Sequence, residues 1–109
     1  MRLGKPNPRV AELPVEVRAA AHVFVNGEVA WPNDHAEAAI EALTATGKRI
    51  LGLDARTLYP DGGVMEIPIS AWSENEGSRA QQVAQARVEA LDALPLALSE
   101  GTHVLITWD

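Results

Sequence analysis

Apolar and polar residues alternate between Arg49 and Ile69 in a way that predicts a β-hairpin. Val, Ile, Leu and Tyr fill the two runs that flank Pro60–Gly63. Glycine tolerates the positive φ of a tight turn, so the chain is expected to reverse at this point. Because side chains alternate along a strand, one side of the first strand is expected to face a core. That side holds Leu51, Leu53, Ala55 and Tyr59, and the opposite side holds Gly52, Asp54 and Arg56.

A helix is predicted after Pro32, because apolar residues then recur at helical spacing. Asp34 and Glu37 have the spacing of a capping box, with Asp in place of the usual Ser or Thr. Gly47 lies where a helix commonly ends in a left-handed residue. The predicted buried side consists of Ala36, Ala39, Ile40 and Leu43.

A second helix is predicted after the hairpin. Ser78 and Gln81 repeat the capping-box spacing, and Pro95 is expected to end the helix because it cannot donate a backbone hydrogen bond. The predicted apolar stripe consists of Ala80, Val83, Ala84, Val88, Leu91 and Leu94.

The remaining strands are predicted near the two ends of the domain. Residues 20 to 31 are strand formers on both sides of an Asn-Gly dipeptide, which predicts a short hairpin or one strand with a bulge. The last strand is predicted from the alternation of Val104, Ile106 and Trp108 with His103, Leu105 and Thr107, and Trp108 is expected to be buried. Pro68 lacks a donor and therefore places its strand at a sheet edge or a bulge.

The resulting order, β-α-β-β-α-β, predicts the α+β class. We expect a ferredoxin-like or related sandwich in which two helices pack on one antiparallel sheet. An irregular α+β sandwich with the same elements is the alternative, and the pattern does not fix the strand order. Residues 1 to 18, with Pro6, Pro8 and Pro14, are predicted as an N-terminal arm that is extended or made of short turns. Residues 19 to 109 are predicted as a single domain, which is long enough to bury its own core.

Composition and charge limit the classes of partner that we expect. Residues 1 to 50 carry six Lys or Arg against six Asp or Glu, whereas residues 51 to 109 carry three against nine, which accounts for the net charge of −6. Nucleic acid and membrane are not expected partners, because the chain lacks a cationic surface and a long apolar run. Absence of cysteine and of an apolar segment after the basic N-terminus favours a cytoplasmic protein.

No catalytic or cofactor motif is found. The three histidines, His22, His35 and His103, fall on separate predicted elements without metal-ligand spacing. A nucleophile elbow, a phosphate loop and a dinucleotide fingerprint are all missing from the sequence. We therefore expect neither a metal nor a cofactor, and we do not expect an enzyme.

The predicted hairpin carries the best candidate for a binding surface. Asp54 and Arg56 share one face of a strand, with Glu66 within reach on the next strand. They could form a surface ion-pair cluster, contact a partner, or act as a catalytic pair of Asp54 and Glu66. Trp72 is either an interface anchor or a lid over the sheet edge. The candidate partner-binding residues are Asp54, Arg56, Asp61, Glu66, Trp72, Glu74 and Glu76.

The order of motifs resembles a family of small immunity proteins from bacterial polymorphic toxin systems. The resemblance rests on E-V-A-W, the helix A-x-x-A-I-E-A-L, the strand G-K-R-I-L-G-L-D, the D-G-G turn, the tryptophan loop and the late V-L-I strand, between residues 20 and 108. Gly52, Asp54 and Trp72 match the family pattern. Ala71 and Ser73 depart from it, since more polar neighbours are expected beside the tryptophan.

The resemblance implies a non-enzymatic inhibitor that binds a cognate toxin and blocks its active site. The acidic charge fits a basic partner such as a nuclease, whose bound phosphates the acids between Asp54 and Glu76 would mimic. The alternative is a small-molecule-binding or degradative ferredoxin-like domain, which would require an apolar cavity between sheet and helices.

Overall fold

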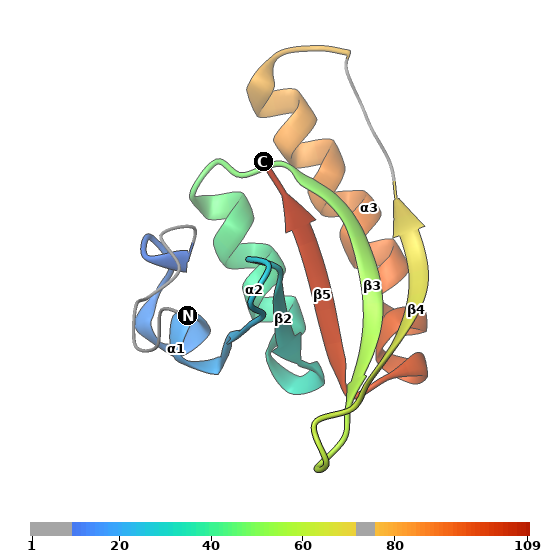
Figure 1. The fold of residues 1–109 in the computed structure, drawn as a ribbon. Coiled ribbons are helices and arrows are strands. Elements are labelled where there is room, and N and C mark those ends of the chain that lie inside the picture. Colours follow the sequence, from blue (N-terminus) through green and yellow to red (C-terminus); the bar gives the residue numbers. More distant parts are fainter. Residues whose placement is uncertain (1–9, 72–75) are drawn as a thin grey trace.

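The computed structural model describes residues 10–71 and 76–109, and in these ranges one five-stranded sheet carries two long helices on one face (Figure 1). A third, short helix lies beside the first long one. The elements are α1 (Val15–Ala20), β1 (His22–Val23), β2 (Val29–Pro32), α2 (Asn33–Ala45), β3 (Ile50–Leu58), β4 (Val64–Ala71), α3 (Arg79–Glu100) and β5 (His103–Trp108).

The strand order is β1-β2-β5-β3-β4, and every neighbouring pair is antiparallel. The crossover from β2 through α2 to β3 passes over β5, and the crossover from β4 through α3 to β5 passes over β3. Each helical connection therefore skips one strand, as in a split βαβ arrangement. The predicted α+β class, with two helices on one antiparallel sheet, is confirmed.

Both hairpins use the same turn. Gly27 and Gly62 have φ values of 91° and 90°, and their N–H groups donate to the carbonyls three residues earlier. Asn26 and Asp61 each accept, through Oδ1, the N–H two residues further on, at 3.0 and 2.8 Å. Local turn chemistry thus fixes both reversals. The prediction of a hairpin is confirmed for β3 and β4. For residues 20 to 31, where a short hairpin or one bulged strand was expected, the structure shows the hairpin of β1 and β2.

The start of α2 differs from the prediction. The helix begins at Asn33 with Pro32 as its N-cap and no side-chain cap, so the capping box proposed for Asp34 and Glu37 is wrong. Instead, Asn33 Nδ2 donates to the carbonyls of Leu98 and Gly101, which ties the start of α2 to the end of α3. The C-terminal prediction is confirmed, because Gly47 has a φ of 80°. The predicted buried side of α2 is confirmed as well.

Helix α3 begins with the predicted capping box between Ser78 and Gln81. The predicted end at Pro95 is wrong, because the helix continues to Glu100. Proline removes one hydrogen bond on the exposed side, and burial of Leu94 and Ala97 on either side offsets that loss. The predicted stripe is also wrong in part, since Ala80, Ala84 and Val88 are exposed. The buried positions are Val83, Ala86, Ala90, Leu94 and Ala97.

The register of β3 shifts twice, and each shift changes which side chains are buried. A shift between Ile50 and Gly52 turns Ile50 into the core and leaves Leu51 half-buried. Leu53 and Ala55 are buried as predicted, whereas Tyr59 lies beyond the strand and is exposed. The second shift lies between Leu53 and Asp54, opposite β4.

The prediction for Pro68 is confirmed. Strand β4 is the last strand of the sheet, and Pro68 pairs with Asp54 beside the register shift of β3. The prediction for Trp108 is also confirmed, since its side chain is buried 5.9 Å from the ring of Trp31.

Part of the predicted arm packs on the domain. Val10, Leu13 and Val17 belong to the core, and Trp31 Nε1 donates to the carbonyl of Val17 at 2.8 Å. Pro14 is the N-cap of α1, a position that needs no backbone donor. In the part of the chain that the structure describes, no helix combines the length and apolar character that a membrane span requires.

Candidate functional site

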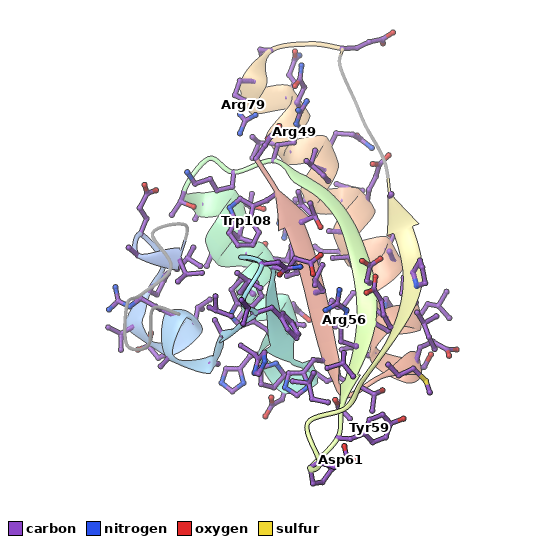
Figure 2. All side chains as sticks on the ribbon, viewed as in Figure 1. Arg49, Arg56, Tyr59, Asp61, Arg79 and Trp108 are labelled. Carbon is purple, nitrogen blue, oxygen red and sulfur yellow. The ribbon has the colours of Figure 1, made fainter. Side chains whose placement is uncertain are left out.

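Arg56 lies at the centre of the sheet face opposite the helices (Figure 2). The register places it beside Glu66 on β4 and His103 on β5. Its Nη2 atom is 2.6 Å from Glu66 Oε2 and 3.2 Å from Glu28 Oε1. The predicted proximity of Asp54, Arg56 and Glu66 is thus realised, and Glu28 joins them from the first hairpin.

Arg56 is buried, with 6% of its surface exposed, although it is charged. Its guanidinium carbon lies 4.9 Å from the centre of the Phe24 ring, which adds a cation–π contact. A buried charge is tolerated only when it is paired, and two carboxylates meet that requirement. Arg56 therefore fastens the turn of the first hairpin to the middle of the sheet.

The surroundings of Asp54 shift the pKa of its carboxyl group. Burial raises the pKa of its carboxyl above the ordinary value, and the negative charges of Glu66 and Glu28 raise it further, against the opposing effect of Arg56. A hydrogen bond to Glu66 also favours the protonated form. The contact with Glu66 is thus part of what holds the pKa of the Asp54 carboxyl above its ordinary value.

We expect Asp54→Asn to stabilise the protein at neutral pH. An amide can donate to Glu66 without an ionisation penalty, so the free energy of unfolding at pH 7.5 should rise by up to about 1 kcal/mol. A raised folded-state pKa contributes stability that is complete below the unfolded pKa of about 3.9 and lost as pH rises through the folded pKa. The gain of the variant should therefore vanish near pH 3.

Urea unfolding at both pH values measures this difference. Asp92→Asn provides a control with the same charge change at an exposed site on α3. A destabilised Asp54→Asn at pH 7.5 would show that the charged form is the favoured one.

Two histidines lie beside the cluster. The rings of His22 and His103 are 6.3 Å apart, and His22 packs edge-on against Phe24 at 4.6 Å. Burial lowers the pKa of His103, and the nearby His22 lowers it further, while Asp34 opposes the shift. Across residues 10–71 and 76–109, no group of three or more His, Cys, Asp or Glu side chains could hold a metal ion.

The cluster of Glu28, Asp54, Arg56 and Glu66 acts mainly as a clamp that joins the first hairpin to β3 and β4. Arg56 pairs with Glu28 and Glu66, and Asp54 is hydrogen-bonded to Glu66, so these four side chains interact mainly with one another. Within the described residues, Arg56 Nε is buried without a hydrogen-bond partner. Glu28 and Glu66 keep 41% and 45% of their side-chain surface exposed, which leaves them able to contact a partner. Of the residues predicted on this strand pair, Glu66 is therefore the better contact candidate.

Two other predicted contact residues lie at separate places in the described structure. Asp61 is exposed at the tip of the hairpin, where one carboxylate oxygen supports the turn (Figure 2). Glu76 is exposed just before α3. Trp72 and Glu74 lie outside the residues that the structure describes.

A groove between β4 and α3 adds a feature that sequence reasoning missed. It has a volume of about 350 Å³ and is lined by Ser70, Glu89, Asp92 and Ala93. Glu89 Oε2 is buried and has no hydrogen-bond partner within the described part of the chain. The sequence did carry a signal for this groove. Glu89 and Asp92 are three residues apart and therefore share one face of the helix, beside its buried stripe.

Comparisons of the chain with protein-family models, with curated proteins and with solved structures found no match in any of the three.

Proposed function

We propose that this protein is an immunity protein, a non-enzymatic inhibitor that binds and neutralises a cognate bacterial toxin domain through an acidic surface. The observation that carries the proposal is the engagement of every base in residues 51 to 109. Arg56 pairs with Glu66, Arg79 with Asp109, and Arg87 with Glu41. The four acids of this half for which the described residues supply no basic partner are Asp61, Glu89, Asp92 and Glu100.

These acids occupy one side of the molecule. Asp61 lies at the tip of the β3–β4 hairpin, and the other three lie on α3, which packs behind β3 and β4 (Figure 1). Together with Glu66 they form what we call the acidic side, defined as Asp61, Glu66, Glu89, Asp92 and Glu100. An excess of negative over positive charge on one side attracts a basic partner and raises its association rate. A nuclease, whose active site binds phosphates, is a partner of the required charge.

The groove favours an inhibitor over the alternative of a small-molecule-binding or degradative domain. Ligand sites for small molecules are mostly enclosed and apolar, with few polar groups. This groove is open and its lining includes Glu89 and Asp92. We accordingly infer that the partner is a protein with a basic surface, encountered in the cytoplasm.

Co-expression tests the proposal. The protein should be expressed with the products of the two adjacent reading frames, one of which is expected to stop growth alone and to form a one-to-one complex with this chain. Restored growth together with co-purification supports an immunity function. If neither product is toxic and neither binds, the proposal fails.

Charge removal tests the acidic side once the complex is in hand. Asp61→Asn combined with Asp92→Asn should slow association at low salt by about fivefold, because steering depends on net charge near the interface. The matched control is Glu16→Gln combined with Glu37→Gln, on α1 and α2, which changes the net charge equally. Equal slowing by both pairs would mean that overall charge, and not this side, steers the partner.

A further inference from the structure

The outer edge of β4 is open for pairing in the described structure. Strand β4 is last in the sheet order, and β3 is its one neighbour among the described strands. Val64 and Met65, at its start, are each about half exposed. A free edge presents unpaired N–H and C=O groups, which natural proteins usually block with charges, proline or a bulge.

Pro68 shows which backbone groups of β4 point outward. It lies in a paired strand but has no N–H to donate, so its amide position must face away from β3. Backbone direction alternates along an antiparallel strand, and the N–H groups of Val64 and Glu66 therefore face outward too. The turn agrees with this assignment. Tyr59 N donates to the carbonyl of Gly63 at 2.9 Å, so the backbone of Gly63 faces β3 and that of Val64, the next residue, faces outward. Residues 64 to 67 thus form a short stretch of free edge before the proline.

The groove lies along the same edge, on the helix side. Ser70 contributes to it from β4, and Glu89 and Asp92 contribute from α3. A strand added to β4 would direct alternate side chains toward this side of the sheet. The buried, unpartnered Glu89 Oε2 is then a suitable acceptor for the charged end of a Lys or Arg.

Charge decides between two possible occupants of this edge. If a second copy of the chain paired edge to edge, Glu66 and Asp61 of both copies would approach one another, and like charges across paired strands are destabilising. A segment rich in Lys or Arg would instead face carboxylates on the edge strand, at the hairpin tip and in the groove. The exposed acids therefore favour a basic segment from another protein.

We propose that the outer edge of β4 captures an extended basic segment of the toxin as an added strand, with one cationic side chain seated between Glu89 and Asp92. Main-chain hydrogen bonds to residues 64 to 66 supply the pairing, and the groove selects the charge. This inference rests on the proposed function, because the segment belongs to the cognate toxin.

A proline substitution tests the edge without disturbing β3. Val64→Pro removes one outward N–H and leaves the inward hydrogen bonds of β4 intact, so the variant should fold and bind the toxin at least tenfold more weakly. Val25→Pro is the matched control, because it places proline at the turn position that Pro60 occupies in the other hairpin. The control should bind as tightly as the parent chain. Circular dichroism confirms that both variants fold.

A model peptide tests the same edge independently of the toxin. An eight-residue peptide of alternating Lys and Val should protect the amides of Val64 and Glu66 from hydrogen exchange, and a peptide of alternating Glu and Val should not. Glu89→Gln combined with Asp92→Asn should abolish the effect of the Lys peptide. Sedimentation reports self-association, and a dimer that Val64→Pro dissolves would assign the edge to a second copy and overturn the inference.

The outcomes separate the two proposals. If the toxin binds the parent chain and Val64→Pro equally well, the immunity function stands and the edge inference falls. If the toxin does not bind the parent chain, the proposed function itself fails.

Discussion

Replacing Arg56 with alanine is expected to lower the free energy of unfolding by about 2 to 4 kcal/mol. The change removes the one cation from a group that contains Glu28, Asp54 and Glu66, and it leaves their negative charges facing one another. It also removes the contact with Phe24 and opens space at a buried position. The loss should therefore greatly exceed that of an ordinary ion pair. Urea unfolding at pH 7 measures it.

Arg87→Ala is the matched control for Arg56→Ala. Arg87 also pairs with a carboxylate, at 2.5 Å from Glu41, but 40% of its side chain is exposed. Solvent screens an exposed pair, so this variant should lose much less stability than Arg56→Ala. Similar losses in the two variants would contradict the role of Arg56 as a buried clamp.

The clamp also predicts how the loss depends on pH. Lowering the pH protonates the carboxylates that Arg56 neutralises, so their mutual repulsion in Arg56→Ala weakens. The destabilisation should be smaller at pH 4 than at pH 7. An unchanged difference would assign the effect to lost packing alone.

Gly101→Ala is expected to destabilise the protein by about 2 kcal/mol. A Cβ atom at this position would lie 2.6 Å from the carbonyl oxygen of Arg56 and 3.0 Å from its carbonyl carbon. The obstacle is the backbone of a central strand, which Thr102 also contacts through an N–H donated to the same oxygen at 2.9 Å. Neither side can move without breaking the sheet, so the midpoint of thermal unfolding should fall by several degrees.

Gly63→Ala is the control for the same chemical change. A Cβ there would meet Asp61 Oδ1 at 3.1 Å, which is the end of a flexible side chain and not a backbone atom. We expect the loss to be well under half of that for Gly101→Ala. If Gly101→Ala is as stable as the parent chain, the connection between α3 and β5 can shift enough to accommodate the Cβ atom, and the prediction is wrong.

Local chemistry made several elements predictable. The Asn-Gly and Asp-Gly turns, the Ser78 capping box and the left-handed Gly47 depend on residues within a few positions of one another. The alternation that paired Arg56 with Glu66 across a hairpin is of the same kind. The errors arose where a distant contact competes. Asn33 begins α2 because it bonds to the end of α3, and α3 continues past Pro95 because Leu94 and Ala97, on either side of the proline, are buried in the core.

For the candidate site, sequence alone determined that acids dominate the second half and that Asp54, Arg56 and Glu66 share one face. Only the tertiary structure decided their roles. It brought Glu28 and Phe24 from the first hairpin onto Arg56, engaged all three bases of that half in ion pairs, and made Asp54 part of a carboxyl pair. It also set β4 at the edge beside Glu89 and Asp92. The reason is physical: alternation and spacing act between near neighbours, whereas burial, charge pairing and strand order depend on segments that meet only when the sheet is assembled.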